Sequence, residues 1–177
     1  MGKIKRETLQ LLFPALLTLL WMYVIFRFSA QTADASDHLS SGLLYRFLSA
    51  LLPGFRSRSA AEQQTIAENL HVIFRKCGHF SEYTILGILL TATVRRIPGI
   101  TDQSRQAAPK RAIILPALCA LIYAESDEIH QYYVPGRSCE LRDVCIDFCG
   151  ACLGILIASA AALLFRRRRG AAADHTA

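Results

Sequence analysis

Apolar residues in this sequence are gathered into four long runs that are separated by polar and charged segments. The first run, residues 8–26, contains no charged side chain over 19 residues. A helix of that length crosses a hydrocarbon core of about 30 Å. Residues 83–94 and 112–124 form shorter uncharged stretches, whose helices rise only about 18–20 Å. To cross a membrane, both of these must include the polar residues at one of their ends.

The pattern predicts an all-α integral membrane protein, a four-helix bundle with spans at about residues 8–28, 79–97, 112–132 and 144–165. The first run is longer than the apolar part of a secretory signal peptide, so we expect it to be retained. On this division of the chain, residues 1–7 are a cytoplasmic N-terminus, residues 8–165 are the membrane domain, and residues 166–177 are a basic, disordered cytoplasmic tail.

The segment between the first two spans, residues 36–75, has helical patterns of its own. Leucine and phenylalanine recur at helical spacing in its first half, which predicts an amphipathic helix lying in the outer membrane interface. The Pro53-Gly54 dipeptide ends that helix. Ser59 and Glu62 have the spacing of a capping box, so a further helix is expected to begin there and to run toward the second span.

The net charge of +6 is concentrated at the ends of the apolar runs. This distribution is typical of membrane anchoring and not of a nucleic-acid groove, and we find no nucleic-acid-binding motif. Residues 95–111 and both termini are basic, whereas residues 125–143 carry five acidic residues and two arginines. We therefore expect both termini in the cytoplasm and the 125–143 loop outside. Residues 27–78 are also placed outside. They carry six Lys/Arg against four Asp/Glu, and so fit less well the rule that basic loops lie in the cytoplasm.

With this topology, polar side chains from all four spans reach the outer leaflet. His79, Glu82 and Tyr83 share one helical face, because they lie at positions i, i+3 and i+4. An ionisable group inside a span costs roughly 2.5–3.5 kcal/mol on insertion scales, so a gathering at one depth indicates a functional site. The complete set is Ser29, Gln31, Lys76, His79, Glu82, Tyr83, Asp127, Glu128, His130, Gln131, Arg137, Asp143 and Asp147.

We interpret this set as a pocket for an anionic envelope lipid or its sugar–phosphate headgroup. Lys76 and Arg137 are expected to hold the anion, and the Pro135-Gly136 turn fixes the direction of the arginine. His79 or His130 is expected to act as acid or base, oriented by a carboxylate. The candidates for catalysis are His79, Glu82, Asp127, Glu128 and His130. The candidates for binding are Lys76, Tyr83, Gln131, Arg137, Asp143, Asp147, Ser29 and Gln31. Whether the pocket carries out a reaction stays open.

Two other interpretations of the same residues stay open. The two cations and two histidines can form a purely structural network with the carboxylates. Alternatively, a divalent cation can be held by the set Glu82, Asp127, His130, Asp143 and Asp147. The sequence contains no metal motif of fixed spacing, and it assigns no metal and no cofactor.

The stretches "RKCGHFSEYTILGILL" and "YAESDEIHQYYVPGRSCELRDVCIDFCGACLG" resemble the two signature regions of the VanZ-like family of bacterial membrane proteins. "FSAQ", after the first span, is similar to a short segment of that family. The resemblance covers residues 20–160. It implies a bacterial inner-membrane protein linked to the cell envelope, with membrane lipids as partners. The founding member is associated with resistance to the glycopeptide teicoplanin, but the resemblance supplies no reaction.

Two rival functions belong to different classes. Cys149 and Cys152 form a CxxC motif, which resembles that of DsbB-type and vitamin K epoxide reductase-like thiol–quinone oxidoreductases, with Cys77 and Cys139 as the shuttle pair. The latter two can instead form a structural disulfide, and the CxxC can belong to a helix-packing stripe of small residues. The second rival is a non-enzymatic envelope protein that shields a glycopeptide target.

Overall fold

The computed structural model describes the backbone of residues 2–98, 100 and 108–174, and in this part of the chain it contains five α-helices and no strands. In order they are α1 (Gly2–Ser29), α2 (Ala33–Leu51), α3 (Ala60–Val94), α4 (Ala108–Tyr132) and α5 (Leu141–Asp174). The prediction of an all-helical chain is confirmed. Residues 99 and 101–107 of the basic segment predicted between spans two and three, including Arg105, lie outside the described residues, as do residues 175–177.

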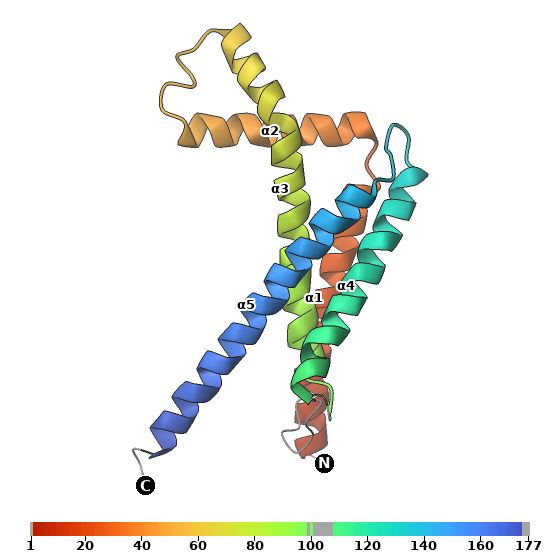
Figure 1. Ribbon diagram of the computed structural model, residues 1–177, viewed down its shortest axis with the longest axis vertical. Coiled ribbons are helices and arrows are strands. Elements are labelled where there is room, and N and C mark those ends of the chain that lie inside the picture. The colour runs from red at the N-terminus through yellow and green to blue at the C-terminus, as the bar shows by residue number, and fades with distance from the viewer. Residues whose placement is uncertain (1, 99, 101–107, 175–177) are drawn as a thin grey trace.

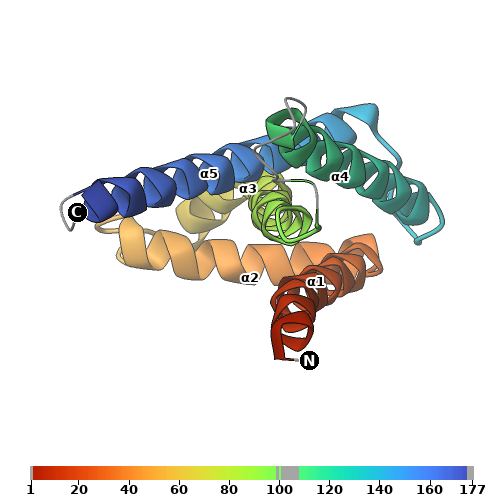
Figure 2. The same cartoon turned by 90° about the horizontal axis from the view of Figure 1, so that it is seen from below.

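Four of the helices run along the long axis of the molecule, and α2 lies across it (Figure 1). The N-terminus and the last turns of α5 lie at one end, and α2 and the α4–α5 loop lie toward the other. Seen along the axis, α3 occupies the middle, with α4 and α5 on one side and α1 and α2 on the other (Figure 2). The central position of α3 lets it contribute side chains to every neighbouring helix.

The local signals that begin and end helices act as the sequence predicts. Ser59 caps α3 by accepting a hydrogen bond from the backbone N–H of Glu62, at 3.3 Å. The Glu62 carboxylate in turn accepts from the backbone N–H of Ser59 at 2.9 Å, which completes the capping box. From this cap, α3 continues without a break for 35 residues. The outer helix and the predicted second span are therefore one helix.

Helices α3 and α5 approach each other closely because glycines stand at the contact. A Cβ atom added to Gly154 would lie 2.0 Å from the carbonyl oxygen of Thr84, and one added to Gly150 would lie 2.3 Å from that of Phe80. On the opposite side of the contact, Gly87 packs against the backbone of Ala151. Small residues permit such backbone contact between helices in a membrane. The contact fixes which residues of α5 face α3.

Two hydrophobic clusters hold the helices together. The larger one lies where α1, α3, α4 and α5 meet and consists of Ile25, Tyr83, Leu86, Leu90, Ala120, Ala124, Val144 and Ala151. The smaller one attaches α2 to the outer part of α3 through Leu44, Leu48 and Phe55, packed against Ile66 and Phe74. Burial of apolar surface in these clusters positions both the bundle and the crossing helix.

Two helical segments, Thr8–Ser29 and Leu141–Phe165, are long and apolar enough to cross a membrane by length and composition. In α3 and α4 the uncharged stretches are shorter and comprise residues 83–94 and 112–124. Helix α5 continues to Asp174, although disorder was expected after residue 165. Arginine and alanine are strong helix formers, which accounts for this extension.

Candidate functional site

The predicted polar residues gather toward the end of the molecule opposite the N-terminus. They come from the end of α1 and the turn after it, the middle of α3, the last two turns of α4, the loop after it and the first turns of α5. Several are removed from solvent, since Ser29, Asp127, Glu128, Gln131 and Asp147 are each at most 3% exposed. Burial of this many polar groups means that their contacts with one another decide what the site can do.

Asp127 is the centre of a hydrogen-bond chain that links α1, α4 and α2. The hydroxyl of Ser29 donates to Asp127 Oδ2 at 2.8 Å, and the amide of Gln131 donates to the same oxygen at 3.2 Å. The carbonyl oxygen of the Gln131 side chain accepts from both Nε and Nη2 of Arg137. Arg137 Nη1 then donates to Ser36 Oγ of α2 at 3.1 Å. The chain holds the guanidinium group between α4 and α2.

The backbone before Arg137 is shaped by glycine. Gly136 has a φ of +76°, in the left-handed region that favours glycine. A Cβ at Gly136 would also lie 2.9 Å from the Cβ of Ala33, whose N–H donates to the carbonyl of Pro135 at 3.3 Å.

Burial is the largest cause that lowers the pKa of Arg137 below its ordinary value, and the neighbouring Arg75 adds to it. An arginine keeps its charge at neutral pH nonetheless.

Lys76 forms an ion pair with Asp143. Its ammonium group contacts both carboxylate oxygens of Asp143, and both side chains are mostly buried. The hydrogen bonds of Arg137 go instead to Gln131 and Ser36. Lys76 and Asp143 therefore form a pair that ties α3 to the start of α5.

His79 and Asp147 form a second pair between the same two helices. Nδ1 of His79 lies 3.8 Å from Oδ1 of Asp147, and the Asp147 side chain is 0% exposed. This separation is longer than a hydrogen bond, and among the described residues both carboxylate oxygens and the Nδ1 atom lack a hydrogen-bond partner. In sites without ligand, catalytic hydrogen bonds are often long and shorten on binding. The geometry thus suits a carboxylate that orients an imidazole.

Tyr83, Glu128 and His130 are also incompletely satisfied among the described residues. The Tyr83 hydroxyl, Oε1 of Glu128 and Nε2 of His130 are buried without hydrogen-bond partners in the described part of the chain. Glu128 Oε2 accepts from the backbone N–H of Glu140 at 3.0 Å, which fastens the α4–α5 loop. The His130 ring lies against Phe26, with ring centroids 4.7 Å apart. His79 lines the cavity described next, whereas His130 does not.

A cavity of ≈ 240 Å³ lies in the angle between α2 and α3. Its polar lining residues are Gln31, Ser36, Ser40, Arg75, His79, Glu82 and Arg137. Its apolar lining residues are Phe28, Leu39, Leu43 and Phe74. A lining of both kinds suits an amphiphile, whose headgroup and chain need different surroundings.

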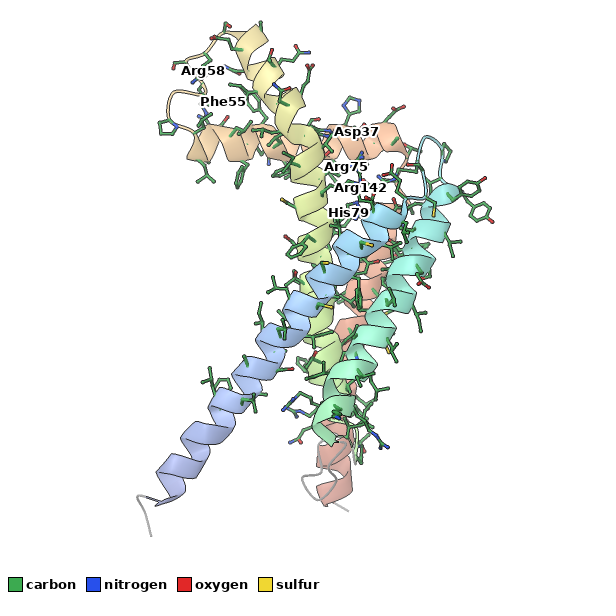
Figure 3. All side chains as sticks on the ribbon, in the orientation of Figure 1. Asp37, Phe55, Arg58, Arg75, His79 and Arg142 are labelled. Atoms are coloured by element: carbon green, nitrogen blue, oxygen red, sulfur yellow. The ribbon has the colours of Figure 1, made fainter. Side chains whose placement is uncertain are left out.

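The cavity contains residues that the sequence interpretation missed. Arg75 lines it and donates to Asp37 of α2 at 3.0 Å (Figure 3). His71 lies 2.7 Å from the hydroxyl of Ser40, so polar contacts add to the apolar attachment of α2. Arg75, His79 and Glu82 are spaced i, i+4, i+7 on one helical face, and this spacing was available in the sequence. The contribution of α2 to the cavity cannot be read from the sequence, because it depends on how that helix packs against α3.

The metal and thiol alternatives find little geometric support. Within the part of the chain that the structure describes, no three His, Cys, Asp or Glu side chains are grouped to hold a metal ion. The five residues considered as ligands are therefore not brought together around one point. All six cysteines are free, and Cys77 and Cys139 form no disulfide. Cys149 is exposed and Cys152 is half-buried on α5.

Comparison with known proteins identifies the family. No curated protein and no solved structure matches the chain significantly. The model of the VanZ/LLP1 family matches residues 7–165, which contain every residue of the site described above. Because this match covers nearly the whole chain, the protein belongs to the VanZ/LLP1 family.

Proposed function

We propose that this protein is a four-span bacterial inner-membrane protein whose outer-leaflet cavity binds an anionic envelope lipid. The spans are α1, the inner part of α3, α4 and the apolar part of α5, with both termini in the cytoplasm. Support comes from the basic residues next to both termini and from the position of these termini at one end of the bundle (Figure 1). It also comes from two helical segments of membrane-spanning length.

In this proposal, α2 lies in the outer interface. Its buried Leu44 and Leu48 pack on α3, yet another row of α2 remains exposed and apolar. That row consists of Leu39, Leu43, Phe47 and Leu51, which are between 43% and 65% exposed. Because α3 covers only one apolar side of α2, the other apolar side is expected to lie against the hydrocarbon of the membrane. Exposed Tyr132 and Tyr133, at the end of α4, suit the same interface.

The observation that carries the proposal is the cavity lined by both cationic and apolar side chains. Arg137 and Arg75 line it and supply the charge that an anionic headgroup needs. Gln131 and Ser36 hold the Arg137 side chain in place, so the side chain loses little conformational entropy when it binds a ligand. Leu39 and Leu43 line the cavity and also belong to the exposed row of α2. A lipid can therefore enter from the membrane with its chain along α2.

His79 is the acid–base candidate in this cavity, with Asp147 as its positioning residue. Binding and catalysis can be separated with a shape-preserving His79→Gln change. In a binding protein, this variant keeps its ligand and its cellular effect. In an enzyme, the variant keeps its ligand and loses its cellular effect, because the acid or base is missing.

The test of binding is lipid-resolved mass spectrometry of the purified protein, with wild type beside Arg137→Gln. Loss of a charge-assisted hydrogen bond is worth about 1.5–3 kcal/mol, so we expect a co-purified anionic lipid to fall about tenfold or more. Arg142→Gln is the matched control, because Arg142 is 69% exposed and pairs with Glu140. Bulk lipid alone in all three samples would contradict the proposal.

We further propose that the lipid is a glycan precursor of the envelope, so that the protein affects teicoplanin susceptibility. The support is family membership together with the anion-holding cavity. Expression of wild type in a sensitive strain should raise the inhibitory concentration of teicoplanin, and Arg137→Gln should not. Equal protection by both would favour a shielding protein that does not use the cavity.

A further inference from the structure

The close contact of α3 and α5 has a geometric consequence at the opposite end of the molecule. The two helices touch at Gly150 and Gly154 and then diverge toward the termini (Figure 1). Two straight helices that touch near one end must leave a wedge between them at the other. Helix α1 borders this wedge and does not close it.

The wedge is a groove of ≈ 670 Å³ with apolar walls from three helices. Leu9 and Phe13 of α1, Ile88 of α3, and Ala158 and Phe165 of α5 are among its lining residues. Leu9, Phe13 and Phe165 are each more than 60% exposed. Apolar surface of this extent within a membrane is covered by hydrocarbon or by protein.

The end of the groove carries positive charge. Arg95 and Arg96 follow the last turn of α3 and both line the groove. From Ile88 to Arg96 the chain rises about 12 Å as helix. One leaflet of hydrocarbon is about 15 Å deep. The apolar walls therefore match the depth of one acyl layer, and the arginines stand where lipid phosphates lie.

We propose that this groove binds an anionic glycerophospholipid of the cytoplasmic leaflet, with its acyl chains between α1, α3 and α5 and its phosphate at Arg95 and Arg96. Basic pockets between helices on the cytoplasmic side are typical sites for anionic headgroups. A second copy of the chain fits less well, because a two-fold contact would place like-charged arginines together. The proposal shares with the proposed function only the placement in the membrane.

The probes are phosphatidylglycerol and phosphatidylcholine with identical chains, presented to the purified full chain in nanodiscs or mixed micelles. Native mass spectrometry gives the ratio of the two lipids retained. We expect wild type to prefer phosphatidylglycerol about tenfold, and Arg96→Gln to bring that ratio close to one. Arg142→Gln, at the other end of the molecule, should keep the wild-type ratio.

Occupation of the groove itself is tested by filling it. Ala162 lines the groove, and Ala162→Trp should lower retention of both lipids because the side chain takes the place of acyl chains. Ala158→Phe is the second filling variant. Circular dichroism and monodisperse elution show whether each variant folds. If neither filling variant folds, the test rests on Arg96→Gln, which should fold because Arg96 is exposed at the end of α3.

Three results would overturn this inference alone. The first is equal retention of the two lipids by wild type. The second is an unchanged preference in Arg96→Gln. The third is a dimer, detected by light scattering, that Ala162→Trp dissociates, since this result would assign the groove to a second copy. A chain that stays soluble without detergent would refute the membrane placement and both proposals, whereas loss of ligand in Arg137→Gln alone concerns only the outer cavity.

Discussion

Nδ1 of His79 lies 3.8 Å from Oδ1 of Asp147, and this pair joins the cavity between α2 and α3 to the buried contact of α3 with α5. His79 lines the cavity, while Asp147 is fully buried behind it. Asp147 lies about one helical turn before Gly150, whose close approach to Phe80 sets the register of the two helices. The pair therefore depends on glycine contacts as much as on its own chemistry.

Replacement of the buried Asp147 carboxyl group should stabilise the protein. Both carboxylate oxygens are buried without hydrogen-bond partners among the described residues, and such a group costs about 1–3 kcal/mol of desolvation or more. Asp147→Asn should therefore raise the temperature of unfolding in detergent. Asp143→Asn is the matched control and should lower that temperature, because its carboxylate pairs with Lys76. A fall in both variants would show that Asp147 makes a favourable contact in the folded protein.

Enlargement of Gly154 should separate α3 from α5. A Cβ at this position would lie 2.0 Å from the Thr84 carbonyl oxygen, so Gly154→Leu must push the helices apart. We expect loss of the monodisperse folded protein, or a fall of the unfolding temperature with loss of the co-purified lipid. Gly42→Ala is the control, because a Cβ there meets nothing within 4 Å. That change should stabilise α2 by up to about 1 kcal/mol.

A side chain at Gly136 should weaken ligand binding through Arg137. Gly136→Ala places a Cβ in the left-handed region, which costs roughly 1–2 kcal/mol, and moves the loop away from Ala33. The amount of co-purified anionic lipid should fall together with stability. Gly54→Ala separates the two effects, since Gly54 has nearly the same φ of +75° but lies outside the cavity. It should lose stability and keep its lipid.

Acid should loosen the first turn of α3. The side-chain hydrogen bond with Ser59 is the largest cause that lowers the pKa of Glu62 from its ordinary value of 4.5. A lowered pKa in the folded state means that the cap contributes stability above the unfolded pKa and loses it as pH falls through the folded one. Hydrogen exchange at the amides of residues 62–65 should therefore lose protection below about pH 4.5 relative to the rest of α3. Glu62→Gln should flatten this dependence, and an equal pH response in wild type and variant would contradict the assignment.

The sequence by itself determined the features that depend on neighbouring residues. The helical character, the capping box at Ser59 and the helix before Pro53 all follow from local spacing. The family was also indicated by continuous stretches of sequence, and the family model confirms it. Such signals act within a few turns of helix, so they can be recognised in the sequence without knowledge of the packing.

Only the tertiary structure decided which of those residues meet. It paired Lys76 with Asp143 and His79 with Asp147, and it brought Arg75 and the apolar row of α2 to the cavity. The two pairs depend on the register between α3 and α5, which is set by glycines facing backbone atoms far away in the sequence. Helical periodicity gives the face of each helix, but the height and rotation at which two faces meet come from packing across the whole bundle.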